Sequence, residues 1–231
     1  MMTTPKLIFF DAGGTLFEVR GSVGEIYSRF ARRFGLDIGE AVLQQRFGAA
    51  FRAQPPLAFP GVEAEAELLR REYKWWRNLV WRVFAAWEFP RFDECFAELF
   101  EHFRHVEAWR LYDDVVPTLS ALRERGVRLA VLSNFDARLI DLLRGFALDD
   151  FFADVHLSAR LGAAKPEGRI FQAALRAHGL QPHEVWHVGD SVREDVEGAR
   201  NVGITGCLID RVGNSDAEGI RRLDQLVELL P

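Results

Sequence analysis

The distribution of apolar residues along the chain predicts buried strands at five places. Short, mainly apolar runs predict strands that are covered on both faces, and they span residues 7–10, 127–132, 155–157, 185–188 and 204–209. From residue 114 onward, segments with apolar positions at helical spacing separate these runs. Strands that alternate with helices predict an α/β fold with a Rossmann-like, doubly wound parallel sheet as its core.

A long helical segment interrupts this alternation after the first strand. Residues 20–105 show no strand pattern, and their apolar positions predict four helices, over about 22–34, 39–51, 62–89 and 92–105. Ser22 and Glu25 match the S-x-x-E capping box at the start of the first helix. We therefore expect a Rossmann-like core with an inserted helical-bundle cap: the core formed by residues 1–17 and 107–231, and the all-helical cap by residues 18–106.

The composition narrows the class of protein and its partners. With 48% apolar and 27% charged residues, the 231-residue chain is typical of a globular protein. A formal net charge of -5 argues against a nucleic-acid-binding protein, because phosphate backbones require a concentrated positive surface. No apolar run reaches the roughly 18 residues of a membrane span, and the N-terminus lacks the apolar segment of a signal peptide. We expect a cytoplasmic protein with a small-molecule substrate and no nucleic-acid or membrane partner.

Polar residues follow several of the predicted strands at the point where each strand ends. Asp11 ends the first strand, Ser133 the second and Asp190 the fourth. Parallel strands bring their carboxyl ends to one edge of a sheet, so we expect these side chains to lie together, with Lys165 and Asp195 on the same edge. Each residue alone could be a cap or a surface residue. Together, closely placed carboxylates repel one another unless a cation lies among them, and oxygen ligands favour Mg²⁺.

Four segments that contain these residues resemble the motifs of a known superfamily. The segments FFDAGGTL, VLSNFD, AAKPEGRIF and GDSVREDVEGAR are similar in wording, order and spacing to the four motifs of the haloacid dehalogenase-like hydrolases. An inserted helical cap is typical of one branch of that superfamily, so the resemblance covers the whole chain, and it is strongest to the haloacid dehalogenase-like hydrolase domain-containing members. The resemblance implies that Asp11 is a nucleophile, which forms an aspartyl-phosphate in phosphatase members. It also implies that Ser133 and Lys165 hold phosphoryl oxygens, that Asp190 binds Mg²⁺, and that Asp195 binds the ion or orients its ligands.

These roles fit the physical needs of phosphoryl transfer. A phosphoryl group carries negative charge on several oxygens, so its site needs fixed positive charge and hydrogen-bond donors. Lys165 supplies charge, Ser133 a hydroxyl, and the glycine-rich turn backbone amides. The predicted cofactor, Mg²⁺, would screen the nucleophile from an anionic substrate. The predicted site consists of catalytic Asp11, Ser133 and Lys165, phosphate-binding Ala12, Gly13, Thr15, Ser133, Asn134 and Lys165, and metal-binding Asp11, Gly13, Asp190 and Asp195.

One position departs from the family pattern. Phosphatases of this superfamily usually carry D-x-D in the first motif, where the second acid protonates the leaving group, whereas this chain has Asp11, Ala12 and Gly13. Gly13 can offer its carbonyl oxygen to a metal, but it cannot transfer a proton. A positioned acid–base group contributes roughly 10²- to 10⁴-fold in rate, so this difference bears directly on activity.

Three functions stay open on the sequence alone. The first is a Mg²⁺-dependent phosphatase with an atypical first motif, acting on a small phosphorylated metabolite. The second is a 2-haloacid dehalogenase, in which Asp11 would attack carbon without a metal. The third is a phosphate-binding protein with little or no catalysis. The acidic pair in GDSVRED favours the first over the second, because dehalogenases tend to carry an asparagine there.

Overall fold

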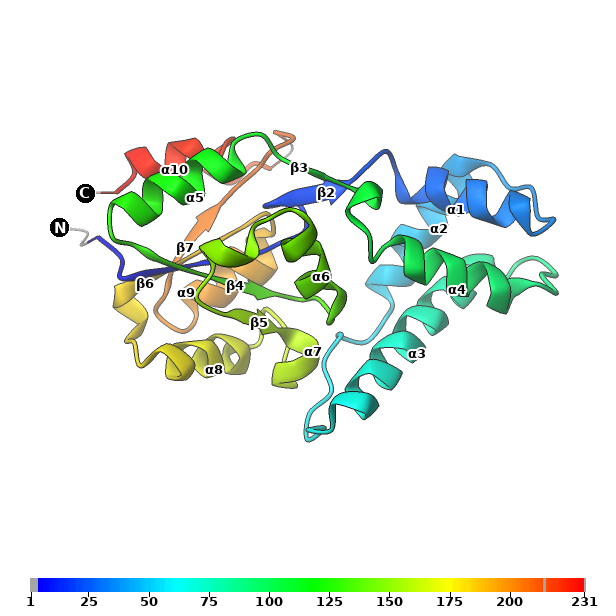
Figure 1. Ribbon diagram of the computed structural model, residues 1–231, viewed down its shortest axis with the longest axis horizontal. Helices are drawn as coiled ribbons and strands as arrows, with labels where there is room; N and C mark the ends of the chain where they lie inside the picture. Colours follow the sequence, from blue (N-terminus) through cyan, green and yellow to red (C-terminus); the bar gives the residue numbers. More distant parts are fainter. Residues whose placement is uncertain (1–3, 214, 231) are drawn as a thin grey trace. The chain divides into compact units, whose positions relative to one another are not determined.

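The computed structural model of the chain describes residues 4–213 and 215–230, which form two compact units (Figure 1). The α/β unit consists of Met1–Glu18, Leu57–Val62 and Leu111–Pro231, and the helical unit of Val19–Pro56 and Glu63–Arg110. The helical unit is thus an insertion within the sequence of the α/β unit. Within the described part of the chain, no helix combines the length and the apolarity that crossing a membrane requires.

A five-stranded parallel sheet forms the centre of the α/β unit, as predicted. Its strand order is β5-β4-β1-β6-β7, with β1 at Leu7–Phe10, β4 at Arg128–Ser133, β5 at Val155–Leu157, β6 at Val185–Gly189 and β7 at Thr205–Leu208. β1 is the central strand, and all four of its side chains are fully buried. This burial on both faces explains why β1 reads as an unbroken apolar run.

Helices cover both faces of the sheet. Figure 1 shows α5 and α10 together on one face and α8 on the other. Leu7 and Phe9 of β1 pack with Ile170 and Phe171 of α8 in one apolar cluster. The helices of the α/β unit are α5 at Val115–Glu124, α6 at Arg138–Gly145, α7 at Ser158–Leu161, α8 at Gly168–His178, α9 at Gly198–Arg200 and α10 at Asp224–Glu228. Short turns of helix complete the set, namely η2 at Asp149–Phe151, η3 at Pro182–Glu184 and the π-helix η4 at Val192–Glu197.

The helical unit contains the four predicted helices, together with the turn η1 at Val106–Ala108. The helices are α1 at Val23–Arg33, α2 at Glu40–Arg52, α3 at Glu65–Phe84 and α4 at Phe92–His102. The Ser22 hydroxyl accepts a hydrogen bond from the Glu25 amide at 3.0 Å, so the predicted cap of α1 is present. The third helix is shorter than the predicted range of about 62–89 at both ends. The preceding segment, Leu57–Val62, belongs to the α/β unit, where the Ser158 hydroxyl donates to the Leu57 carbonyl at 2.6 Å.

The structure also contains a two-stranded ribbon that the sequence pattern did not predict. β2 at Phe17–Val19 pairs with β3 at Trp109–Leu111. These strands carry the chain out of the α/β unit and back into it. Each strand has only three residues, which is too short for a periodic pattern, and their pairing joins segments about ninety residues apart along the chain.

Candidate active site

Five of the predicted site residues lie together at the carboxyl edge of the sheet. Asp11 directly follows β1, Ser133 is the last residue of β4, and Asp190 directly follows β6. β1 lies between β4 and β6, so three neighbouring strands bring these side chains to one place. Lys165, from the segment before α8, and Asp195, from η4, complete the cluster.

Lys165 is the buried cation of this cluster. Its ammonium group donates to Asp11 Oδ1 at 2.6 Å and to Asp195 Oδ1 at 2.5 Å, and the residue is only 4% exposed. Burial by itself would lower the pKa of Lys165, but the two carboxylates outweigh burial and hold that pKa above its usual range. Lys165 therefore keeps its positive charge at every pH at which the protein would work.

Asp195 is held by three donors. Besides Lys165, its carboxylate accepts hydrogen bonds from His187 Nε2 at 2.8 Å and from the Ser191 amide at 2.9 Å. Burial opposes ionisation of Asp195, yet Lys165 and His187 lower its pKa well below the usual range. Burial also lowers the pKa of His187, whose Nδ1 is buried without a partner, so a neutral ring with its proton on Nε2 fits this position. Asp195 is thus a fixed anion that orients Lys165.

Asp11 and Asp190 carry the negative charge that Lys165 does not balance. Burial raises the pKa of Asp11 above its ordinary value, although Lys165 and a hydrogen bond with Ser133 act against this shift. Asp190 is an exposed residue. The protein around its carboxyl group nevertheless reduces hydration, and this effect, followed by the charges of Asp11 and Asp195, raises the pKa of Asp190 to about 7. Both shifts show that the cluster resists a further negative charge.

The donor set of this cluster fits a hard divalent cation. One oxygen from each of Asp11, Asp190 and Asp195 lies within 4.8 Å of the other two. Carboxylate oxygens are the ligands that Mg²⁺ prefers, and a cation here would relieve the repulsion that raises the pKa of Asp190. Asp11 and Asp190 are the better placed ligands, because Asp195 already accepts three hydrogen bonds.

The turn that follows β1, referred to below as the first turn, brings its backbone close to Asp190. Gly14 has a φ of 77°, and a Cβ atom at this position would lie 2.3 Å from Asp190 Oδ2. Only glycine combines that conformation with so close an approach. Gly13 is different: its φ is outside the left-handed region, and a Cβ atom there would have no atom within 4 Å. The space around residue 13 therefore does not require a glycine there.

Comparison with known proteins places the chain in a family. The model of the haloacid dehalogenase-like hydrolase family matches residues 5–203 of the chain. The chain belongs to that family. The resemblance of the four motifs is thereby confirmed, as is the α/β fold.

Two relatives and one solved structure show what this hydrolase is similar to. Haloacid dehalogenase-like hydrolase domain-containing protein 3 from Homo sapiens is 34% identical over 235 residues, which cover 98% of this chain and 92% of the relative. Phosphoserine phosphatase from Thermus thermophilus is 30% identical over 224 residues, or 89% of each chain. The structure of L-2-haloacid dehalogenase from Xanthobacter autotrophicus has a TM-score of 0.72 at 19% identity, with 97% of this chain and 98% of that chain covered. This last likeness shows a shared fold only.

Three further residues predicted to bind phosphate lie in buried or hydrogen-bonded positions, and their role in binding stays a prediction. Thr15 is fully buried, its hydroxyl has no hydrogen-bond partner, and its amide donates to the Ala12 carbonyl at 3.3 Å. Ala12 is fully buried as well. Asn134 accepts a hydrogen bond from the Lys165 amide at 2.8 Å and donates to the Lys165 carbonyl at 2.9 Å. Asn134 thus positions the main chain of Lys165 instead of facing the site through its amide group.

A second charged network supports the first turn from within the fold. The Arg211 guanidinium donates to the Thr15 carbonyl at 2.6 and 3.1 Å and forms a two-point ion pair with Asp114 at 2.9 and 3.0 Å. The Asp114 carboxylate also accepts the Leu223 amide at 2.8 Å. Asp114 lies at the N-cap position of α5, but its side chain makes no cap hydrogen bond to that helix. These contacts anchor the turn that follows Asp11.

Three supporting residues were missed by the sequence analysis. His187 lies in an apolar buried strand, and a histidine in such a run is a signal of a polar partner inside the fold. Glu194 accepts a hydrogen bond from Asn134 Nδ2 at 3.0 Å, and Arg211 holds the first turn. Glu194 stands within the quoted segment GDSVREDVEGAR, where no role was assigned to it, and no pattern in the sequence distinguishes Arg211 from the many other charged residues of the chain.

Proposed function

We propose that this hydrolase is a Mg²⁺-dependent phosphatase that acts on a small phosphorylated metabolite through an aspartyl-phosphate on Asp11. The main support is the pairing of Asp11 with Lys165 beside the carboxylates of Asp190 and Asp195. One fixed cation faces three carboxylates, so the cluster has room for the charge of a divalent cation. Once that cation is bound, the cluster can also bind an anionic group. The similarity to a phosphoserine phosphatase also supports phosphoryl chemistry.

The residues of the site divide the reaction between them. An oxygen of Asp11 bonds to phosphorus while the bond from phosphorus to the leaving oxygen breaks. The leaving oxygen takes its proton from solvent, because residue 13 is glycine and has no acid to donate one. Lys165 and Ser133 stabilise the charged phosphoryl oxygens as the transition state forms. Water then attacks phosphorus, the bond between phosphorus and Asp11 breaks, and inorganic phosphate leaves with the carboxylate regenerated.

The metal-binding residues in this proposal are Asp11 and Asp190, with the Gly13 carbonyl as a further oxygen donor. Mg²⁺ bound there would supply positive charge between the nucleophile and the anionic substrate. Asp195 orients Lys165 through the short contact between their side chains. Asn134 holds the main chain of Lys165 through hydrogen bonds with its amide and its carbonyl.

A phosphate-binding protein with little catalysis is the second candidate, and Gly13 is the observation that favours it. Without an acid at residue 13, an alkoxide leaving group must depart without protonation by the protein. An aryl phosphate has a better leaving group and depends less on such an acid. The choice of substrate therefore decides whether a chemical test can separate the two candidates.

The test uses p-nitrophenyl phosphate as substrate, with Mg²⁺ and with the ion removed by a chelator. We expect hydrolysis that requires Mg²⁺ and that is lost in Asp11→Asn, which removes the nucleophile and keeps the size of the side chain. Asp149→Asn, an exposed residue of the same unit, is the matched control and should behave as the wild type. Chloride release from 2-chloropropionate is measured in parallel.

The outcomes separate the three functions. Chloride release without Mg²⁺ would contradict the phosphatase proposal and establish the dehalogenase. Binding of inorganic phosphate without turnover of the aryl ester would establish the binding protein. Equal phosphatase activity in Asp11→Asn and the wild type would show that Asp11 is not the nucleophile.

A further inference from the structure

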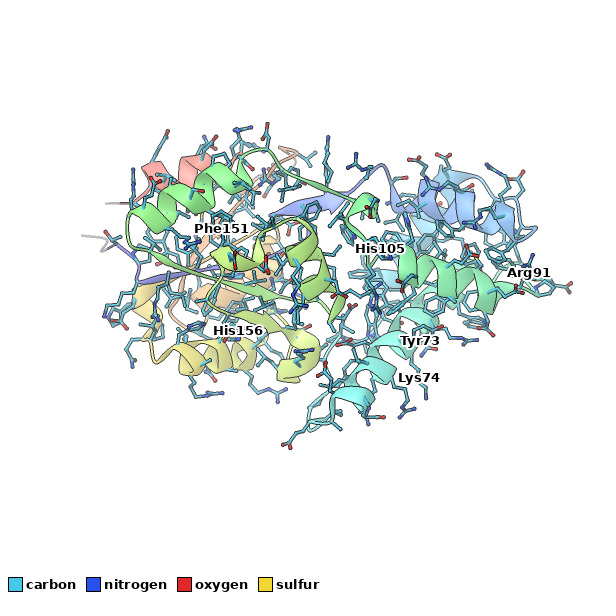
Figure 2. All side chains as sticks on the ribbon, viewed as in Figure 1. Tyr73, Lys74, Arg91, His105, Phe151 and His156 are labelled. Atoms are coloured by element: carbon cyan, nitrogen blue, oxygen red, sulfur yellow. The ribbon has the colours of Figure 1, made fainter. Side chains whose placement is uncertain are left out.

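A second group of potential metal ligands lies on a different part of the α/β unit. Asp154 directly precedes the edge strand β5, His156 lies within that strand, and His178 is the last residue of α8. One ligand atom from each lies within 4.8 Å of the other two. Figure 2 labels His156, on β5 above α8. None of the three residues belongs to the cluster around Asp11.

The two imidazole rings face each other through their Nε2 atoms. These atoms are 2.9 Å apart, the ring centroids are 5.1 Å apart, and the ring planes are nearly perpendicular at 85°. Phe9 packs against both rings, with centroid distances of 5.8 Å to His156 and 5.6 Å to His178. His156 is buried at 6% exposure, so this arrangement is part of the packed interior.

The Asp154 carboxylate is oriented toward the same point. Its Oδ1 accepts the Val155 amide at 2.8 Å, which fixes the direction of the group. Its Oδ2 lies 3.7 Å from His156 Nε2, beyond hydrogen-bond length. Asp154 and His156 are two residues apart on extended chain and therefore point to the same side of the strand. Three potential ligand atoms thus converge, while only the two nitrogens are within hydrogen-bond distance of each other.

We propose that Asp154, His156 and His178 form a binding site for a divalent transition metal, of which Zn²⁺ is the best match. Tetrahedral Zn²⁺, with ligands about 2.0–2.2 Å away, requires ligand atoms about 3.3 Å apart. The observed separations of 2.9 and 3.7 Å lie on either side of that value. Small rotations of the side chains therefore produce the geometry, and solvent takes the fourth position because Asp154 is exposed.

The protonation state of the two rings suits this role. Burial lowers the pKa of both histidines, and the effect of Asp154, which raises both, does not reverse it. The neighbouring His178 ring further lowers the pKa of His156, and Arg128 further lowers the pKa of His178. Neutral imidazoles are the form that binds metal, so little proton release is needed near neutral pH.

The site would connect two elements that the contact between His156 and His178 already brings together. β5 is an edge strand, paired on one side with β4, and His178 lies at the end of a helix. A metal bound to all three residues would cross-link the strand to the helix. Because the metal binds the folded state, it would raise the midpoint temperature of unfolding, and the increase would grow with the logarithm of the free metal concentration above Kd.

The test uses Co²⁺ as a probe for this site in the Mg²⁺-saturated full-length protein. Four-coordinate Co²⁺ with nitrogen ligands absorbs visible light strongly, whereas six-coordinate Co²⁺ among carboxylates absorbs weakly. We expect intense bands in the wild type that Zn²⁺ displaces, and loss of the bands in His178→Gln. We also expect His178→Gln to weaken Zn²⁺ binding by more than about 100-fold, since even outer-shell substitutions cost roughly 10- to 100-fold.

Two controls make the result specific. His183→Gln removes an exposed histidine of the same unit and should keep the bands, as should Asp190→Asn, which alters the acidic cluster. His178 is only half-buried, and the circular dichroism of its variant shows directly whether the fold is intact. Absence of strong bands in the wild type, or bands that persist in folded His178→Gln, would overturn the proposal and leave a simple hydrogen bond between the two histidines.

Discussion

Gly13→Asp tests whether the missing acid limits catalysis by this hydrolase. A Cβ atom at residue 13 meets no atom within 4 Å, and the backbone there is outside the left-handed region, so neither the Cβ atom nor the backbone opposes the substitution. A positioned acid contributes roughly 10²- to 10⁴-fold, or about 3–5 kcal/mol of the barrier. The new carboxyl group also adds charge beside Asp11 and Asp190, which offsets part of that gain at an effective dielectric constant of about 20.

We therefore expect kcat/KM to rise by about 10²-fold for an alkyl phosphate and to change little for p-nitrophenyl phosphate. The difference arises because only the alkoxide leaving group needs a proton from the protein. The assay measures phosphate release over a series of esters with increasing leaving-group pKa, and the dependence on that pKa should become shallower in the variant. Gly13→Asn is the matched control, since it has the same shape without a transferable proton.

No gain, or a loss, on alkyl phosphates in a folded Gly13→Asp variant would refute this reasoning. An equal gain in Gly13→Asn would also contradict it, because the effect would then come from packing or from polarity. Either result would mean that another group already performs the proton transfer, or that another step limits turnover.

The other predictions concern the turn that holds the nucleophile. Gly14→Ala places a Cβ atom 2.3 Å from Asp190 Oδ2, so we expect weaker Mg²⁺ affinity, measured as a higher Mg²⁺ concentration for half-maximal activity. Arg211→Met leaves the buried Asp114 carboxylate without its partner and should destabilise the fold by about 3–5 kcal/mol in urea unfolding. Arg211, by hydrogen bonding, holds the pKa of Asp114 below its usual value against burial. The resulting stability is present above the unfolded pKa of about 3.9 and is lost as pH falls through the lower folded value.

Each of these predictions has a result that contradicts it. Unchanged Mg²⁺ affinity in Gly14→Ala would mean that Asp190 does not hold the ion. For Arg211→Met, the same urea midpoint as the wild type at pH 7 would show that the ion pair with Asp114 is not stabilising. If Arg211→Met still lost stability below about pH 4 as the wild type does, the ionisation of Asp114 would not be the source of that loss.

The sequence by itself determined the elements of the fold and the residues at the ends of its strands. Apolar runs and helical spacing are local patterns, so they revealed the five strands of the sheet and the inserted helices. Asp11, Ser133 and Asp190 could be placed together because parallel strands share one carboxyl edge. The motifs that contain Lys165 and Asp195 were recognisable because each is a short continuous segment.

Only the tertiary structure decided which side chains face one another. Asn134 and Thr15 belong to the expected motifs, yet Asn134 holds the main chain of Lys165 and Thr15 is fully buried. Arg211 reaches Thr15 across 196 positions of the sequence, and His178 meets His156 across 22. Contacts of this kind depend on the packing of separate elements and on side-chain direction, neither of which a local pattern records.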